Sequence, residues 1–424
     1  MEKPVNPNYC ATIVKLPETR IKLQNLDNIV GVNIFGYQVL VSKDTPNGLG
    51  IFFPAEAQLS DKYCYENNLY RHADKNISPD EKGYFEDNRR IKAMKFKGNT
   101  STGLFMPLSS LKFTGIDPLF LKEGDEFDEI NGFEICRKYV VEGKGQKAQQ
   151  LVDRGFVRAD KKFFPEHIDT ENFYKNHDLV DGQELVVVTQ KLHGTSIRIA
   201  NTLVNRKLSL WERFSQFFGA KIAQTEYAML YGSRKVIKDA NNPNQIHFYE
   251  SDIWTNEGKK LDGILPQNYI VYAELIGYTP DGKEIQRNYT YNVPVGQCEM
   301  YIYRIATING QGHMTDLSWK QVKHFCRQNG LKYVPELVRG IKMEDLTKDD
   351  FAGMKKFVDT RYFEGDFRNA VYLGDNKDIV DEGVCVRADG LIPKIFKAKS
   401  PKFLQHETNL LDANVEDLES SQNI

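Results

Sequence analysis

The chain has 424 residues, a net charge of -2 at pH 7 and a hydrophobic fraction of 41%. This hydrophobic content excludes a disordered protein, and the length predicts two or three domains. The balanced charge excludes a globally basic nucleic-acid-binding protein, so any phosphate-binding charge has to be concentrated locally. Because no run of about 18 apolar residues is present, we expect no membrane-spanning helix and no membrane partner.

The six cysteines are scattered along the sequence and form no C-x-x-C pair. Their spacing argues against a zinc ribbon and against a disulfide framework. The first ten residues also lack the pattern of a secretory signal. We therefore expect reduced thiols in an intracellular monomer, cytoplasmic if the source is bacterial or viral. The cysteines are Cys10, Cys64, Cys136, Cys298, Cys326 and Cys385.

Short β-rich runs dominate the first 140 residues, and Gly, Asn and Asp turns separate them. Phe35 and Gly36 form a predicted turn between two of these runs. The stretch at 122–128 indicates a turn into a last strand. Several short strands of this kind predict a small β-barrel. The expected strands cover residues 10–15, 29–34, 37–41, 50–53, 91–96 and 103–106.

A basic cluster within this region has two interpretations. It consists of Arg89, Arg90, Lys92, Lys95 and Lys97. Lysines on an edge strand discourage edge-to-edge aggregation, and this is the favoured interpretation for the cluster alone. The same residues could form a phosphate-contacting face on a nucleic-acid-binding barrel.

Beyond a polar stretch at 141–153, which we interpret as a linker, helices and strands alternate. The aromatic segment at 211–218 predicts a helix or an inserted lobe. The tail at 404–424 contains no Lys or Arg and is expected to be a helix with an acidic end. The remaining predicted elements are strands at 185–189, 270–276 and 301–307 and helices at 317–329 and 349–362.

The candidate catalytic residue is Lys191, which opens the sequence K-L-H-G-T-S directly after an apolar strand. Alone it is no more probable as a nucleophile than as an ordinary loop lysine. Further chemistry-bearing residues follow in order over about 200 positions. Each has a structural interpretation alone, but together they form a catalytic pattern. They are Arg234 after a small-residue turn, Glu274 inside an apolar strand, Tyr303, Glu382 and the pair Lys397 and Lys399.

These motifs resemble those of the lysine-dependent nucleotidyltransferase superfamily of ligases and mRNA-capping enzymes. Within it, K-L-H-G-T and F-K-A-K-S-P-K-F resemble the nick-sealing RNA ligases. A barrel placed before the catalytic domain is similar to a branch that carries an N-terminal OB fold. The segments 165–170 and 247–254 resemble that branch as well.

The resemblance implies an α+β fold, in which an OB-like barrel at 1–140 precedes a nucleotidyltransferase domain at 154–403. That domain consists of antiparallel sheets and helices and is unrelated to ATP-grasp. Lys191 would attack ATP to form a covalent lysyl-AMP. AMP would then pass to a 5′-phosphate, and a 3′-hydroxyl would displace it. Only a neutral amine is nucleophilic, and neighbouring cations favour that form.

The resemblance also implies roles for the remaining motif residues. Lys397 and Lys399 would be catalytic and would neutralise the α-phosphate. Glu382 would bind Mg²⁺ or Mn²⁺ through water. The expected nucleotide contacts are Arg234 to phosphate or ribose, Glu274 to the ribose hydroxyls and Tyr303 to adenine, with His193 and Gly194 of the K-L-H-G-T motif completing the site.

Two positions depart from the family pattern. Gln190 stands where related phage enzymes tend to have a carboxylate for the adenine amino group, and an amide can accept a hydrogen bond there only without charge. Arg304 follows Tyr303, where relatives often have Asp. The strand could therefore be shifted, which would make Tyr301 the alternative stacking residue.

These observations predict an ATP-dependent RNA ligase that acts on nicked duplex RNA or an RNA-containing duplex. A DNA ligase and a capping-type guanylyltransferase remain alternatives, and an inactive nucleic-acid-binding protein is a remote one. In the ligase interpretation, the basic cluster of the barrel contacts the duplex backbone.

Overall fold

The computed structural model describes residues 3–140, 159–167, 169–239, 245, 247–360, 363, 367, 369–374, 376 and 378–413. The linker predicted at 141–153 lies outside the described residues, and so do residues 414–424 of the predicted tail. We refer to residues 3–140 as the N-terminal part and to residues 159–413 as the C-terminal part.

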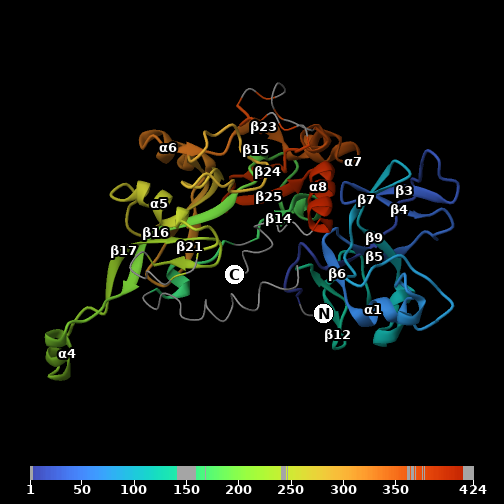
Figure 1. Ribbon diagram of the computed structural model, residues 1–424, viewed down its shortest axis with the longest axis horizontal. Coiled ribbons are helices and arrows are strands. Elements are labelled where there is room, and N and C mark those ends of the chain that lie inside the picture. The colour runs from blue at the N-terminus through green and yellow to red at the C-terminus, as the bar shows by residue number, and fades with distance from the viewer. Residues whose placement is uncertain are drawn as a thin grey trace.

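The N-terminal part consists of small antiparallel sheets (Figure 1). The hairpin expected around Phe35 and Gly36 is confirmed. Both residues have positive φ, 48° and 73°, as a two-residue type I′ turn requires. The largest sheet has the order β10-β1-β5-β9, and further sheets join β2-β3-β4, β7-β8, β13-β6 and β11-β12. The strands are β1 Ala11–Lys15, β2 Ile21–Lys22, β3 Ile29–Ile34, β4 Tyr37–Ser42, β5 Leu49–Phe53, β6 Ala57–Leu59, β7 Ala93–Phe96, β8 Asn99–Thr102, β9 Leu104–Pro107, β10 Glu126–Phe127, β11 Glu129–Ile130, β12 Phe133–Glu134 and β13 Cys136–Lys138.

No described sheet of this part closes on itself. The mixture of helices and antiparallel sheets confirms the α+β class, whereas the OB-like assignment of the N-terminal part stays a prediction. The stretch at 122–128 does lead into a strand, but three more short strands follow it. One short helix, α1 Asp61–Glu66, packs with Tyr63 and Cys64 into the core of these sheets.

The C-terminal part contains two larger sheets, and the chain crosses between them at the predicted catalytic motif. Strand β15 belongs to a five-stranded sheet, and β16 belongs to a seven-stranded sheet. Only Leu192, His193 and Gly194 separate these strands, so Lys191 lies at the junction. The first sheet contains β14 Glu171–Asn172, β25 Lys394–Lys399, β24 Gly383–Ala388, β15 Leu185–Lys191 and β23 Glu336–Lys342. The second contains β18 Ile237–Lys238, β17 Thr225–Gly232, β16 Thr195–Asn205, β19 Tyr269–Gly277, β20 Cys298–Ile308, β21 Met314–Asp316 and β22 Lys332–Tyr333.

Helices cover these sheets. The predicted helix at 317–329 is confirmed as α6 Trp319–Gln328, which begins with a capping box from Ser318 and Gln321. Gly330 follows its end with a φ of 65°. The element α7 Met343–Val358 consists of two helical segments separated by non-helical residues 348–351, and the helix expected from residue 349 corresponds to the second segment. The other helices are α3 Phe173–Asn176, α5 Ile253–Gly258 and α8 Pro401–Asp412.

The aromatic segment forms the predicted helix, α4 Leu210–Phe217, at the tip of an arm between β16 and β17 (Figure 1). None of its residues is buried. Trp211 and Phe217 are 79% and 83% exposed, so α4 covers no core in the described part of the chain. No helix among the described residues is both long and apolar enough to cross a bilayer.

Candidate nucleotidyl-transfer site

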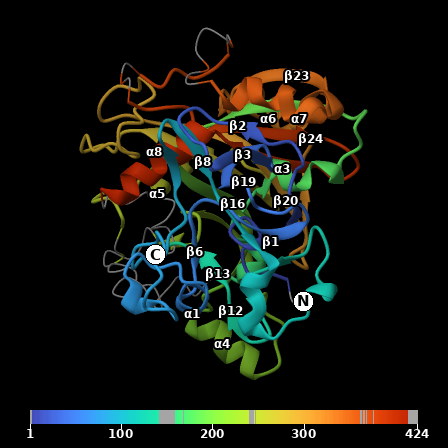
Figure 2. The ribbon, with the colours of Figure 1, turned by 90° about the vertical axis from the view of Figure 1, so that its right-hand side faces the viewer.

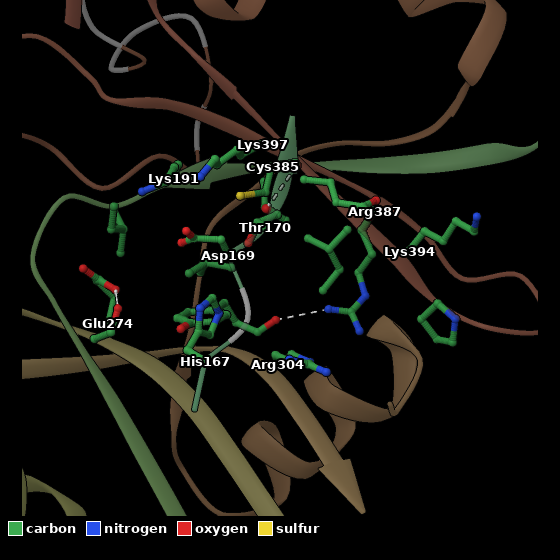
Figure 3. Close-up of a pocket in the computed structure, with 18 of the residues that line it drawn as sticks. His167, Asp169, Thr170, Lys191, Glu274, Arg304, Cys385, Arg387, Lys394 and Lys397 are labelled. Carbon is green, nitrogen blue, oxygen red and sulfur yellow. Dashed lines mark hydrogen bonds between the residues drawn. The ribbon is translucent and has the colours of Figure 1, made fainter. Parts of the chain in front are cut away.

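A cavity of about 390 Å³ lies between the two sheets of the C-terminal part (Figure 3). A volume of this size is typical of small-molecule sites. Figure 3 shows Lys191 and Lys397 together on one sheet and Glu274 on a strand of the other. Seven of the residues predicted for the site line the cavity: Gln190, Lys191, Arg234, Glu274, Tyr303, Lys397 and Lys399. The other three predicted residues, His193, Gly194 and Glu382, do not line the cavity.

Three neighbouring strands bring the predicted catalytic lysines together. Lys191 of β15 pairs with Gly383 of β24, and Gly383 pairs with Lys399 of β25. Directly opposed residues point to the same face of a sheet, so both lysines reach the cavity. Gly383 is required between them, because its φ is 139° and a Cβ would lie 2.1 Å from the carbonyl oxygen of Ala398.

Glu382 is the buried counter-charge of these lysines. Its side chain has 0% exposure, and its Oε1 lies 2.6 Å from Lys191 Nζ and 3.7 Å from Lys399 Nζ. A buried carboxylate is tolerated only when cations or hydrogen-bond donors compensate it. The expected position of Glu382 beside the nucleophile is therefore present, while its role toward a metal ion stays a prediction.

His193 does not line the cavity and instead contacts residues of two other predicted motifs, Glu382 and Phe403. It is 4% exposed, and its ring packs edge-on against Phe403, with the centroids 4.9 Å apart. Gln286 Nε2 lies 2.7 Å from His193 Nε2, and His193 Nδ1 faces Glu382 at 3.6 Å. Since an amide nitrogen donates, Nε2 accepts and the ring proton lies on the Glu382 side. His193 thus lies between Phe403 and the buried carboxylate of Glu382.

Glu274 is held by the loop that follows the nucleophile. It is 7% exposed and accepts hydrogen bonds from the Gly194 backbone N–H at 3.0 Å and from Ser196 Oγ at 3.3 Å. Gly194 has to be glycine, because a Cβ there would lie 2.1 Å from the carbonyl oxygen of Leu275. The N–H of Gly194 therefore positions Glu274, and the expected contact of Gly194 with the nucleotide stays a prediction.

A β-bulge explains the unusual residue after Tyr303. In the pairing of β19 with β20, Tyr272 faces Arg304 and Ala273 faces Ile302, so Tyr303 is the extra residue. Tyr303 lines the cavity, whereas Tyr301 does not. The alternative stacking residue is therefore unnecessary.

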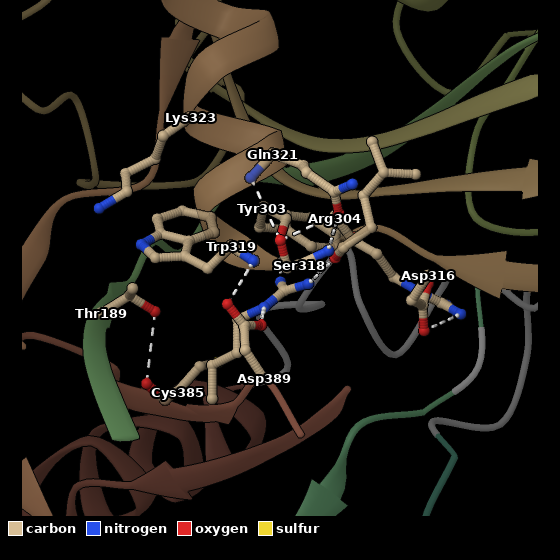
Figure 4. Close-up of polar contacts among 12 residues, drawn as sticks. Thr189, Tyr303, Arg304, Asp316, Ser318, Trp319, Gln321, Lys323, Cys385 and Asp389 are labelled. Carbon is tan, nitrogen blue, oxygen red and sulfur yellow. Dashed lines mark hydrogen bonds and ion pairs between the residues drawn. The ribbon is translucent and has the colours of Figure 1, made fainter. Parts of the chain in front are cut away.

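Arg304 has a structural partner in the adjoining strand. Its Nε lies 2.6 Å from Asp316 Oδ1 (Figure 4), and its guanidinium lies over the ring of Tyr272. The arginine that replaces the family's aspartate thus forms a local ion pair, and it leaves Tyr303 beside the cavity.

Arg234 forms an ion pair with Asp169, which belongs to the segment 165–170. Both residues line the cavity. The turn that carries Arg234 is held by Arg198, a 2% exposed residue of β16. Arg198 donates to the carbonyl oxygens of Ser233, Phe164 and Lys235 at 3.0, 2.7 and 2.8 Å.

Arg387 has a similar supporting role that the sequence analysis missed. It is 3% exposed and donates to the carbonyl oxygen of Tyr303 at 3.1 Å and to that of Leu317 at 2.7 Å. Arg198 and Arg387 are each a charged residue within an apolar strand. The same signal identified Glu274 and could have identified both arginines.

The side chain of Gln190 is engaged inside the protein. Its Nε2 donates to Asp381 Oδ1 at 2.8 Å, and its Oε1 accepts from the Val371 N–H at 2.7 Å. Burial raises the pKa of Asp381 to about 6, although bonds from Phe363 and Gln190 oppose the rise. An adenine contact by Gln190 stays a prediction, and it would have to break these bonds.

The basic cluster of the N-terminal part does not form one surface. Arg90 is 3% exposed and contacts Glu56 at 3.3 Å and Asp412 at 2.5 Å. We therefore no longer expect Arg90 to contact a phosphate. Arg89 donates to the Leu59 carbonyl oxygen, and Lys92 pairs with Asp412 at 2.8 Å. Lys95 and Lys97 are exposed.

Comparison with known proteins agrees with this geometry. A family model described as RNA ligase matches residues 184–399, from the start of β15 to Lys399, the last residue of β25. No curated protein matches the chain. The structure is similar to that of an RNA ligase from Naegleria gruberi with pyrophosphate, at a TM-score of 0.60 and 16% identity, covering 96% of this chain and 100% of that one.

Two further structures from Naegleria gruberi support the same fold. A mutant RNA ligase in its apo form matches at a TM-score of 0.59 and 16% identity, over 96% of this chain and 100% of that one. Another mutant, with ATP and manganese, matches at 0.57 and 16%, over 95% and 100%. The likeness covers the N-terminal part as well as the two sheets around the cavity.

Proposed function

The chain belongs to the RNA ligase family, and from this premise we propose that it is an ATP-dependent ligase that joins 3′-OH and 5′-phosphate ends of RNA at nicks in duplexes. The observation that carries the proposal is the register of β15, β24 and β25. It places Lys191 and Lys399 on either side of Gly383, with Glu382 2.6 Å from the nucleophile.

In the first step, Lys191 Nζ attacks the α-phosphorus of ATP. A phosphorus–nitrogen bond forms, the bond from the α-phosphorus to the bridging oxygen breaks, and pyrophosphate leaves. Glu382 Oε1 is placed to accept the proton that the amine loses. Lys397 and Lys399 neutralise charge that develops on the α-phosphate, which is the dominant contribution of proteins to phosphoryl transfer.

The remaining lining residues fit the rest of ATP. Glu274 presents a buried carboxylate that can accept from the ribose hydroxyls. Tyr303 offers a ring to the base, and stacking on an aromatic face suits any purine. Arg234 presents a planar guanidinium group that can donate hydrogen bonds to a phosphate. Its ion pair with Asp169 holds the side chain at the cavity before ATP binds.

A Mg²⁺ or Mn²⁺ ion fits this site only if phosphate oxygens of the nucleotide provide some of its ligands. The described residues contain no group of three His, Cys, Asp or Glu side chains that could hold a metal ion. Mg²⁺ commonly uses one or two carboxylates, water and substrate phosphates, and Glu382 provides such a carboxylate. When bound, the ion would offset phosphate charge. The structural relative with ATP and manganese supports this part of the proposal.

In the second step, a 5′-phosphate oxygen of the RNA attacks the lysyl-AMP phosphorus, and Lys191 is released. In the third step, the 3′-hydroxyl attacks the activated 5′-phosphate, and AMP leaves. We assign residues 154–403 to the nucleotidyltransferase domain and residues 1–140 to an OB-like domain that contacts the duplex. Within its basic cluster, Lys95 and Lys97 are the exposed residues that could make these contacts.

The decisive experiment is incubation of the protein with α-labelled ATP and Mg²⁺. Wild-type protein should retain the label and Lys191→Ala should not. The matched control Lys332→Ala, a half-exposed lysine outside the cavity, should label normally. Unlabelled wild-type protein would refute the ligase. Labelling with GTP in place of ATP would indicate a capping-type guanylyltransferase. Nucleic-acid binding without label would indicate an inactive binding protein.

A panel of nicked duplexes tests the substrate. The strands would differ only in having RNA or DNA on each side of the nick. We expect sealing to require RNA on at least one side. Equal sealing of an all-DNA nick would instead indicate a DNA ligase.

A further inference from the structure

Lys399 is held between two buried carboxylates. Its Nζ lies 3.7 Å from Glu382 Oε1, and it lies 3.1 and 3.2 Å from the two carboxylate oxygens of Glu407. The side chains of Lys399 and Glu407 are only 11% and 10% exposed. Charges that are removed from water interact more strongly than surface pairs do, because less solvent screens them. Glu407 therefore fixes where the ammonium group of Lys399 lies.

Helix α8 brings Glu407 back to Lys399. The helix begins directly after β25, where Ser400 caps it by accepting from the Lys402 N–H and Pro401 occupies the first turn. The Ser400 N–H donates to the carbonyl oxygen of Glu382 at 2.9 Å. The position of Glu407 relative to Lys399 thus depends on the direction in which α8 leaves the sheet.

The N-terminal part fixes that direction. Figure 1 shows α8 between the sheets of the C-terminal part and strand β7, and Figure 2 shows it beside strand β8. Thr408, the neighbour of Glu407, donates through Oγ1 to Glu56 Oε1 at 2.8 Å. The same Oγ1 accepts from the Ala93 N–H at 3.1 Å. Arg90 donates to the Thr408 carbonyl oxygen at 3.2 Å. All of these groups are buried or nearly so.

A second contact reaches Lys399 itself. The Tyr37 hydroxyl donates to the Lys399 carbonyl oxygen at 3.0 Å. Tyr37 is 7% exposed and belongs to the hairpin of β3 and β4. The N-terminal part therefore holds both the backbone of the lysine and the helix that carries its carboxylate partner.

Glu56 lies in an environment that costs stability. It is 6% exposed and has a φ of 66°, which is rare for a residue with a side chain. Burial raises its pKa to about 7, and Glu407 adds to the rise, while Arg90 and Thr408 oppose it. Buried groups with strained backbone and shifted pKa values concentrate at functional sites. The arrangement is therefore consistent with a role beyond joining two parts of the chain.

We propose that Glu407 is a positioning residue for Lys399, and that Tyr37, Glu56 and Arg90 of the N-terminal part hold it in place. The inference rests on the proposed function of Lys399 at the α-phosphate. It goes further, because it makes the N-terminal part necessary for the first step, in which no RNA takes part. A domain that served only to bind the duplex would not affect that step.

The test is the single-turnover rate of Lys191 adenylylation in the full-length chain, measured without RNA as a function of ATP concentration. Glu407→Gln keeps the shape of the side chain and removes its charge. We expect the maximum rate to fall about tenfold or more, with the half-saturating ATP concentration changing less than about threefold. That split distinguishes loss of transition-state stabilisation from loss of ATP binding.

Thr408→Val tests the link to the N-terminal part, because it removes only the hydroxyl that contacts Glu56 and Ala93. We expect a fall of about three- to tenfold in the same maximum rate. In the Glu407→Gln background, Thr408→Val should cause no further fall, because its effect passes through Glu407. The matched control is Glu257→Gln. Glu257 is 12% exposed and pairs with Lys260 at 2.6 Å outside the cavity, and its loss should leave the rate unchanged.

The outcomes separate this inference from the proposed function. Labelled wild-type protein supports the function whatever the variants do. A Glu407→Gln rate within about twofold of wild type would overturn the positioning role. Independent, multiplicative losses from Glu407→Gln and Thr408→Val would overturn the link through Glu407. If Thr408→Val unfolds the protein, Tyr37→Phe replaces it, and an unchanged maximum rate in that variant overturns the role of the N-terminal part.

Discussion

Removal of the Arg198 guanidinium should loosen the turn that carries Arg234. Arg198 donates to the carbonyl oxygens of Ser233 and Lys235 in that turn and to the carbonyl oxygen of Phe164, and its guanidinium also lies over the Phe164 ring at 4.4 Å. In Arg198→Leu these carbonyl groups lose their donor. At about 1 kcal/mol for each buried acceptor left without a partner, the loss is about 3 kcal/mol. For a chain of 424 residues, with an unfolding entropy of about 0.9 kcal/mol/K, this corresponds to a fall in Tm of about 3–4 °C.

The assay combines thermal unfolding with the ATP dependence of Lys191 adenylylation. Arg198→Leu should lower Tm by that amount, and it should raise the half-saturating ATP concentration because Arg234 is no longer held at the cavity. Arg198→Lys should be intermediate, since one ammonium group cannot reach three diverging carbonyls. Arg327→Leu is the control, because Arg327 makes one exposed contact with Tyr333. A Tm within about 2 °C of wild type for Arg198→Leu would refute the reasoning.

Three further predictions follow from the described contacts. Tyr303→Ala should raise the half-saturating ATP concentration about five- to hundredfold through lost stacking, whereas Tyr301→Ala should lower only Tm. Burial lowers the pKa of Lys238 to about 8, so the charged form destabilises the fold below that pH. The gain in Tm from Lys238→Met should therefore be largest below pH 8 and should vanish as the pH approaches about 10.5. The double variant Trp211→Ser with Phe217→Ser should leave Tm within about 1 °C of wild type, because both side chains are exposed.

Elements whose signals are local were predicted most accurately. The hairpin of β3 and β4 appears at the expected residues, because apolar alternation and a tight turn specify it within a few positions. The first segment of α7, before the non-helical residues 348–351, was not predicted, for the opposite reason. It is stabilised by burial of Met343 and Leu346 against distant residues. A sequence pattern does not contain that packing.

The sequence identified the residues of the candidate site, but it did not identify which of their side chains point into the cavity. Gln190 borders the cavity, but neighbouring residues of a strand point to opposite sides, so the bonds of its side chain away from Lys191 could have been anticipated. The position of Gly383 between two lysines could not, because it depends on pairing among three strands that lie far apart in sequence. Non-local register is set by the assembled sheet.

The basic cluster shows how a local charge pattern misleads. Arg90 was grouped with its neighbours because five basic residues occur within nine positions, yet its guanidinium contacts Thr408, 318 residues away. Exposure divides the cluster into two groups. Lys95 and Lys97 are exposed, and we propose that they contact RNA, whereas the buried Arg90 joins α8 to the N-terminal part. A deletion of residues 1–140 would therefore remove two things at once, the proposed duplex-contacting surface and the proposed support of Lys399. Only point variants such as Thr408→Val and substitutions of the exposed lysines can assign a lost activity to one of them.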